Sequence, residues 1–262
     1  KITDITGVPT QTWELLNHPD RDSYDLSSLR TLGGGGGPRP AEHVKALDKN
    51  FKGRPGIGYG LTETNALGTM GAGDEYINNP SSAGRVVPPL TEIKIIDENW
   101  QELPEGKIGE VAIRSQSNMK GYWRNDDATA ECINSEGWFK SGDLGKFDGP
   151  FLYILDRLKD MVIRGGENIA CPEVEGAIYE HPDVLEASVF GIPDERLGEI
   201  LCSSICLREG SKLSVESLNE FLSDKLAAFK IPVKIKFTYN PLPKIASGKF
   251  DKPTMRQNFI EE

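Results

Sequence analysis

The sequence lacks the features that mark several common classes of protein. No apolar run approaches the roughly 18 residues that a transmembrane helix needs, and the first residues, KITDITGVPTQTW, show no signal-peptide pattern. The formal net charge of −10 and the lack of a basic stripe argue against a nucleic-acid surface, which needs clustered positive charge. We therefore expect a soluble, cytoplasmic protein that has no transmembrane segment and binds no nucleic acid.

Residues that bind zinc are scarce as well. The four cysteines form no CxxC pair and there are only three histidines, which argues against a zinc site and favours buried thiols in a reducing cytosol. The chain also begins at Lys1 without an initiator methionine. We interpret this start as a sign that the chain is a fragment.

Two familiar catalytic motifs are missing. The pair Gly248-Lys249 resembles the end of a nucleotide-binding P-loop, but Pro243 stands where the first P-loop glycine belongs. Phe250 replaces the Ser or Thr that would reach Mg²⁺. The GxSxG elbow of a serine hydrolase is absent too, so neither class is indicated.

The composition is that of a globular protein, and the length allows two compact cores. Of 262 residues, 37% are hydrophobic and 27% charged, which excludes a disordered or membrane-embedded chain. Up to about residue 150, short apolar runs alternate with turn signals. We predict strands near 92–96, 111–113 and 151–155, with a turn at 103–106.

The pattern changes after residue 160 to alternating helices and strands. Pro172 suits the first turn of a helix that ends at His181. Ser214 can cap a second helix, whose apolar residues recur at helical spacing as far as Leu226. The predicted strands are 185–189, 200–207 and 234–239. We therefore predict an α+β domain of about 100 residues behind a larger, strand-rich one.

Five consecutive glycines, Gly33 to Gly37, form a backbone without Cβ atoms. Such a backbone can approach a flat ligand or turn its amides toward an anion. Taken alone, the run fits a flexible surface loop better than a binding site.

The segment from Gly58 to Glu63, GYGLTE, is more specific. It places an aromatic ring at Tyr59, a hydroxyl at Thr62 and a carboxylate at Glu63. A tyrosine ring can cover a base, a threonine can bind a phosphate oxygen, and a carboxylate offers the hard oxygen that Mg²⁺ prefers. Taken alone, this segment still fits a structural turn.

Polar and charged residues gather again farther along the chain. In GWFKSGDLG, Asp143 offers two acceptor oxygens that match the two vicinal hydroxyls of a ribose, although an aspartate at such a place also caps turns. The charged segments 156–160 and 164–168 follow, and such segments are usually solvated surfaces. The tail PLPKIASGK ends with Lys249 on a glycine turn.

In this order and at these spacings, YGLTE, GWFKSGDLG, DRLKDMVIRGGENI and PLPKIASGK resemble the adenylate-forming superfamily, and within it the acyl-CoA synthetases of fatty-acid-CoA ligase type. The resemblance covers nearly the whole chain and corresponds to the C-terminal half of the family. It implies α/β and α+β folds. Residues 1–158 would be the C-terminal part of the large AMP-binding domain, and 159–262 a small mobile lid domain with its hinge near Lys159.

The resemblance also implies roles for individual residues. Tyr59 would stack on adenine, Thr62 would contact the phosphates, and Glu63 would bind Mg²⁺. Asp143 and Arg157 would bind the ribose. Further nucleotide contacts are implied for the backbone glycines Gly35, Gly36, Gly37, Gly58 and Gly60.

The second half of the chain carries the other implied roles. Gly165 and Gly166 would line the path of the CoA pantetheine. Lys249 would act in adenylation together with Thr62 and Glu63, because its positive charge offsets charge that builds up at phosphorus.

The chain departs from the family in two ways. The Ser/Thr/Gly-rich loop that holds the triphosphate is expected upstream of Gly33 and is absent, so we expect this chain alone to be inactive. In the run of five glycines, the family usually shows one or two larger or polar residues.

The implied function is ATP-dependent activation of a carboxylic acid to an acyl-adenylate and then to an acyl-CoA thioester, with ATP, Mg²⁺ and coenzyme A as cofactors or co-substrates. A fatty acid is our first expectation for the substrate and an aryl carboxylate the second. One alternative is transfer of the acyl group to a carrier-protein thiol, and another is a non-catalytic nucleotide-binding relative. The resemblance leaves homo-oligomer formation open.

Overall fold

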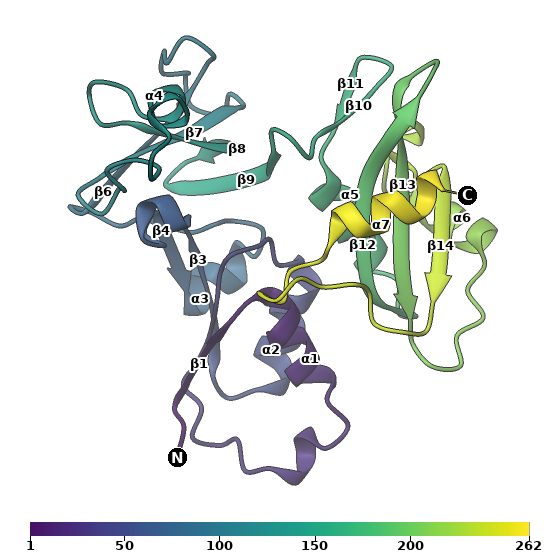
Figure 1. Ribbon diagram of the computed structural model, residues 1–262. Helices are drawn as coiled ribbons and strands as arrows, with labels where there is room; N and C mark the ends of the chain where they lie inside the picture. Colours follow the sequence, from purple (N-terminus) through teal and green to yellow (C-terminus); the bar gives the residue numbers. More distant parts are fainter. Residues whose placement is uncertain (262) are drawn as a thin grey trace. The chain divides into compact units, whose positions relative to one another are not determined.

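Two compact units make up the chain, Lys1–Leu158 and Lys159–Glu262 (Figure 1). The structure is a computed structural model and describes residues 1–261. Within these residues, no helix combines the length and the apolar character needed to cross a membrane.

The first unit begins with a five-stranded sheet in the order β1-β2-β3-β4-β5. β1, β2 and β3 are parallel, whereas β4 and β5 are added antiparallel. The strands are β1 Asp4–Gly7, β2 Thr31–Gly34, β3 Arg54–Tyr59, β4 Thr69–Ala72 and β5 Arg85–Val86. β3 therefore has a neighbouring strand on each side. It ends at Tyr59, the residue predicted to stack on adenine.

Three helices connect these strands: α1 Pro9–Asn17, α2 Ala41–Asn50 and α3 Gly73–Asn78. Leu16 of α1 and Leu47 of α2 pack with Leu32 of β2 in one apolar core. Tyr76 of α3 joins Val44 of α2 in a smaller core against β3. Our prediction of turns and short strands here missed all three helices, as well as the short 3₁₀ turn Thr62–Thr64.

A four-stranded antiparallel sheet completes the first unit, in the order β6-β7-β8-β9. The strands are β6 Thr91–Ile96, β7 Gly109–Ser115, β8 Phe139–Asp148 and β9 Phe151–Arg157. The predicted strands near 92–96, 111–113 and 151–155 are thereby confirmed. One more helix missed by the prediction, α4 Asp126–Cys132, lies between β7 and β8 and is capped by Asn125.

The second unit is an α+β domain, as predicted. Its sheet has the order β11-β10-β13-β12, and β14 also pairs with β13. The strands are β10 Val162–Arg164, β11 Glu167–Ile169, β12 Val184–Asp194, β13 Gly198–Leu207 and β14 Lys234–Thr238; the helices are α5 Cys171–Tyr179, α6 Val215–Ser223 and α7 Lys252–Ile260. A 3₁₀ turn, Ala228–Lys230, lies between α6 and β14.

Both faces of β12 and β13 are covered. Residues of α5 and α6, such as Val174 and Leu218, form the core on one face, while Met255 and Phe259 of α7 belong to a second core with Phe190 (Figure 1). The predicted cap of α6 is confirmed, because Ser214 accepts a hydrogen bond from the backbone N–H of Ser217. The prediction that this helix reaches Leu226 is wrong: α6 ends at Ser223, and Leu226 packs on the core from beyond the helix end.

Candidate functional site

Three predicted residues of the first unit meet in one hydrogen-bonded cluster. The hydroxyl of Tyr59, at the end of β3, donates to Oδ2 of Asp143 at 2.8 Å. Nε of Arg157 donates to the other carboxylate oxygen, Oδ1, at 3.1 Å. Asp143 in β8 and Arg157 in β9 are directly opposite each other in the antiparallel pair, so the backbone register brings them together.

Burial and charge determine the chemistry of this cluster. Asp143 is only 5% exposed, whereas about half of the Arg157 side chain is exposed. Burial raises the pKa of the Tyr59 hydroxyl well above its usual value, and the charge of Asp143 adds to this effect. Tyr59 therefore remains a hydrogen-bond donor at physiological pH. Each oxygen of a carboxylate can accept more than one hydrogen bond, so Asp143 retains the capacity to bind a vicinal diol.

The backbone around Asp143 requires the glycine that precedes it. Gly142 has a φ of +71°, a conformation that side chains disfavour. Its N–H donates to Oε1 of Glu110 at 2.9 Å, and its carbonyl accepts from the N–H of Leu158. The Gly-Asp pair in GWFKSGDLG is thus explained by a kinked strand that presents one buried carboxylate.

The 3₁₀ turn after Tyr59 carries Thr62 and Glu63. Gly60 permits this turn, because a Cβ there would lie 2.4 Å from the carbonyl carbon of Ala66. Oγ1 of Thr64 accepts from the N–H of Leu61 at 3.1 Å, which fixes the turn from within. Thr62 is exposed and available to a ligand, as its predicted role requires.

Glu63 has a partner that the sequence did not indicate. The hydroxyl of Tyr122 donates to Oε1 of Glu63 at 3.0 Å, and the Glu63 carbonyl accepts from the N–H of Met119. Burial, followed by this acceptor, raises the pKa of Tyr122 to about 12. Fifty-nine residues separate the two side chains, and no motif links them.

The predicted magnesium site contains one carboxylate, that of Glu63. No group of three or more His, Cys, Asp or Glu side chains in residues 1–261 could hold a metal ion by itself. Mg²⁺ is commonly bound through one or two carboxylates together with substrate phosphates and water. A single carboxylate at Glu63 is compatible with that mode of binding.

From the run of five glycines taken alone we expected a flexible surface loop, and this expectation is wrong. Gly33 and Gly34 belong to β2, and Gly35 forms a parallel bridge with Gly58 at the end of β3. A Cβ on Gly35 would lie 2.7 Å from the Gly58 carbonyl oxygen, and one on Gly34 would overlap the buried Arg39 guanidinium. Only at Gly36, with a φ of +77°, does the strand turn away.

The remaining predicted residues belong to the second unit. Lys249 is exposed and lies on a short turn, in which its carbonyl accepts from the N–H of Ile245 at 2.9 Å. Gly248 precedes it with a φ of +82°, and Lys244 and Phe250 form an isolated bridge across the turn.

Gly165 and Gly166 form the two-residue turn between β10 and β11, with φ of +59° and +88°. Positive φ at both positions is typical of a type I′ hairpin, so the turn itself requires glycine. Lys159, the predicted hinge, is exposed in the turn that follows β9, where the second unit begins.

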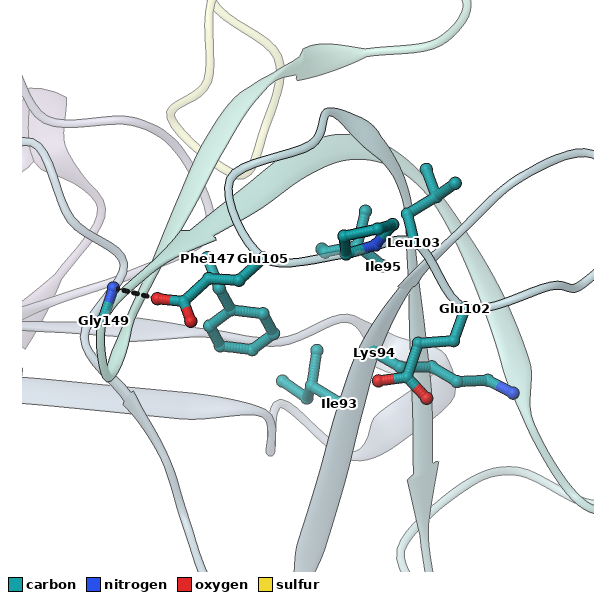
Figure 2. A pocket seen from close by; sticks show the side chains of 9 residues that line it. Ile93, Lys94, Ile95, Glu102, Leu103, Glu105, Phe147 and Gly149 are labelled. Atoms are coloured by element: carbon teal, nitrogen blue, oxygen red, sulfur yellow. Dashed lines mark hydrogen bonds between the residues drawn. The ribbon is translucent and has the colours of Figure 1, made fainter.

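A hollow of about 290 Å³ lies elsewhere in the first unit, over β6 and the loop that follows it (Figure 2). Ile93, Phe147 and Glu105 are among its lining residues, and the Glu105 carboxylate accepts from the N–H of Gly149 at 2.9 Å. None of the predicted site residues lines it.

Two family models match separate parts of the chain. Residues 1–123 match the AMP-binding enzyme family, and residues 173–249 match the AMP-binding enzyme C-terminal domain. The first range contains the Tyr59 and Glu63 motif and the second contains Lys249. Asp143, Arg157 and the Gly165-Gly166 turn fall between the two matched ranges.

Comparisons with individual proteins cover nearly all of the chain. A feruloyl-CoA synthase of Amycolatopsis sp is 37% identical over 261 residues, which are 99% of this chain and 52% of the relative. The mitochondrial medium-chain acyl-CoA ligase ACSF2 of Danio rerio is 36% identical over 98% of this chain and 43% of the relative.

A solved structure also matches nearly the whole chain. The amide bond synthetase McbA from Marinactinospora thermotolerans superposes with a TM-score of 0.88 at 32% identity, over 98% of this chain and 52% of that one. The chain thus spans about half the length of the relatives that it matches. From the two family matches and these relatives, we conclude that the chain belongs to the adenylate-forming superfamily of AMP-binding enzymes, and within it to the acyl-CoA synthetase type.

Proposed function

We propose that the full-length protein carrying this chain uses ATP to convert a carboxylic acid into an acyl-adenylate and then transfers the acyl group to coenzyme A. The observation that carries this proposal is the cluster of Tyr59, Asp143 and Arg157, next to the turn with Thr62 and Glu63. An aromatic ring, a buried diol acceptor and a carboxylate on an adjoining turn are the groups that a nucleoside phosphate with Mg²⁺ requires.

In the first half-reaction, a carboxylate oxygen of the substrate attacks the α-phosphorus of ATP, and the bond to pyrophosphate breaks. Asp143 and Arg157 hold the ribose, the ring of Tyr59 covers adenine, and Thr62 binds a phosphate oxygen. Glu63 would hold Mg²⁺, whose charge offsets that of the phosphates. The ammonium group of Lys249 offsets the charge that builds up around the reacting phosphorus.

In the second half-reaction, the thiol of CoA attacks the acyl carbonyl and AMP leaves. Gly165 and Gly166 present a turn without side chains along which a pantetheine chain can pass. The second unit turns about Lys159 between the two half-reactions, so that one site serves both. Such movements of lids and domains are common in enzymes and often limit the rate.

The names of two relatives suggest two classes of acid substrate. A fatty acid is the first candidate, supported by the medium-chain acyl-CoA ligase, and an aryl acid the second, supported by the feruloyl-CoA synthase. The acceptor thiol is that of free CoA, with a carrier-protein thiol as the alternative. We place the enzyme in the cytoplasm, although one relative is mitochondrial by name.

The test is a screen of carboxylic acids with the full-length protein, ATP and Mg²⁺, read by pyrophosphate release. Acids that release pyrophosphate are then assayed for thioester with CoA and with a phosphopantetheine-bearing carrier protein. Pyrophosphate release with one acid class and thioester with CoA are expected. Binding of AMP with no pyrophosphate release from any acid would instead favour a non-catalytic nucleotide-binding protein.

A further inference from the structure

The turn that carries Lys249 is tied at its start to a buried carboxylate. Nζ of Lys244 lies 2.7 Å from Oε1 of Glu186, and their side chains are only 18% and 8% exposed. Oε2 of the same carboxylate accepts from the backbone N–H of Leu242, also at 2.7 Å. One carboxylate therefore binds two points of the segment that leads into the turn.

Glu186 is itself held by a rigid element. It lies in β12, opposite Cys206 of β13. Side chains alternate along a strand, so Glu186 shares a face with Phe190 and Ile192, which pack with Leu242. This is the face on which α7 lies (Figure 1). A carboxylate in such a core is costly without a compensating charge, and Lys244 provides that charge.

The far end of the turn is anchored in the same way. Nζ of Lys252 lies 2.9 Å from Oε1 of Glu175 in α5, and both side chains are largely buried. That oxygen also accepts from the N–H of Val189 in β12 at 2.9 Å. Asp251 caps α7 by accepting from the N–H of Thr254. The exposed Lys249 thus lies between two buried ion pairs.

We propose that Glu186 is a positioning residue for Lys249, acting through Lys244. By fixing Lys244 and Leu242 on β12, it gives the turn a fixed base from which the ammonium group of Lys249 reaches the phosphates. The inference rests on the proposed function, since it gives Lys249 a role in adenylation.

The test uses the full-length protein and separates the two half-reactions. Glu186→Gln removes the charge that holds Lys244 but keeps the shape of the side chain. Acyl-adenylate formation is measured as pyrophosphate release. We expect its rate to fall by about 10- to 100-fold, because misplacement of a catalytic group by about 1 Å has effects of that size. Transfer to CoA from supplied acyl-adenylate should not change.

Two further variants keep the test decisive if Glu186→Gln does not fold. Lys244→Met removes the charge from the other side and should slow adenylation alone, whereas Lys244→Arg keeps the charge and should restore the rate. Glu180→Gln is the matched control, because Glu180 pairs with Lys225 at 2.6 Å on the exposed surface of the same unit. It should leave both half-reactions unchanged.

An unchanged rate of adenylation in Glu186→Gln or Lys244→Met would overturn the inference. An equal loss of rate in both half-reactions would also overturn it, because such a loss indicates a purely structural role. Lys249→Ala is measured in parallel. If it slows adenylation while the Glu186 and Lys244 variants do not, only the positioning inference fails. If Lys249→Ala has no effect, the proposed role of Lys249 fails and the inference fails with it.

Discussion

The hydroxyl of Tyr59 can be separated from its ring by mutation, which tests the centre of the proposed nucleotide site. Tyr59→Phe keeps the ring but removes the group that donates to Asp143 at 2.8 Å. A hydrogen bond to a charged partner contributes about 1.5–3 kcal/mol. Because about 1.4 kcal/mol corresponds to a tenfold change in a binding constant, the largest possible effect on nucleotide affinity is roughly 100-fold.

Only part of that energy should appear in nucleotide binding. Asp143 keeps its contact with Arg157 at 3.1 Å, so its carboxylate stays in place but loses one of the hydrogen bonds that fix its orientation. We therefore expect the Kd for AMP to rise about tenfold in Tyr59→Phe, which corresponds to about 1.4 kcal/mol. Tyr59→Ala also loses the stacking surface, worth about 1–3 kcal/mol per base, and should bind AMP about tenfold more weakly again.

The assay is calorimetric titration of the full-length protein with AMP, with urea unfolding of each variant alongside. Tyr153→Phe is the matched control: Tyr153 lies on β9 of the same unit, and its hydroxyl makes no hydrogen bond to any residue within 1–261. AMP affinity equal to that of the wild type in Tyr59→Phe would refute the reasoning. A loss of stability without a loss of affinity would mean that Asp143 does not bind the nucleotide.

Four other perturbations test the remaining roles. Lys249→Ala should slow adenylation about 10²-fold, as does loss of one preorganised donor, and spare transfer from supplied acyl-adenylate; equal losses would contradict this division. Lys159→Pro should slow thioester formation more than adenylation, because proline fixes φ; wild-type rates for both would rule out a hinge there. Glu63→Gln should raise the Mg²⁺ concentration needed for half-maximal pyrophosphate release, and an unchanged titration would exclude Glu63 as a ligand. Burial and, to a smaller extent, Glu63 raise the pKa of Tyr122 to about 12, above the value near 10 in the unfolded chain. The contribution of the protonated Tyr122 hydroxyl to stability should therefore be complete below pH ~10 and lost as pH rises toward 12. Urea unfolding across that range should show a smaller loss for Tyr122→Phe, and equal losses would refute the assignment.

The two helices that the sequence predicted each have a recognisable start. α5 has Pro172 in its first turn and α6 has Ser214 as its cap. α1 also has a proline, Pro9, in its first turn and was nevertheless missed, and α2 begins after Pro40 without a side-chain cap hydrogen bond. These helices are held by packing against the parallel strands, and tertiary packing of this kind overrides weak local signals. α4 and α7 were missed although Asn125 and Asp251 offered caps.

For the candidate site, residues close together in sequence were easier to place than partners far apart. GYGLTE could be interpreted as one unit because a single strand end and turn carry it. The pairing of Glu63 with Tyr122 depends on how two distant loops fold and has no sequence signal. The glycine run was misjudged because its close packing involves Arg39 and Gly58, which a count of glycines does not reveal.

The meeting of Asp143 and Arg157 depends on a single irregularity in the sheet. Between β8 and β9, Gly145 pairs with Ile154, and a regular ladder continued from there would place Asp143 opposite Asp156. The register shifts between Leu144 and Gly145, so Asp143 faces Arg157 instead. A shift of one residue exchanges the partner of every following side chain, and bulges of this kind often lie next to active sites. Two carboxylates would otherwise have been opposed in a buried place. Neither family model matches the β8–β9 hairpin. The pairing of Asp143 with Arg157 therefore supports the proposed nucleotide site independently of the two family matches.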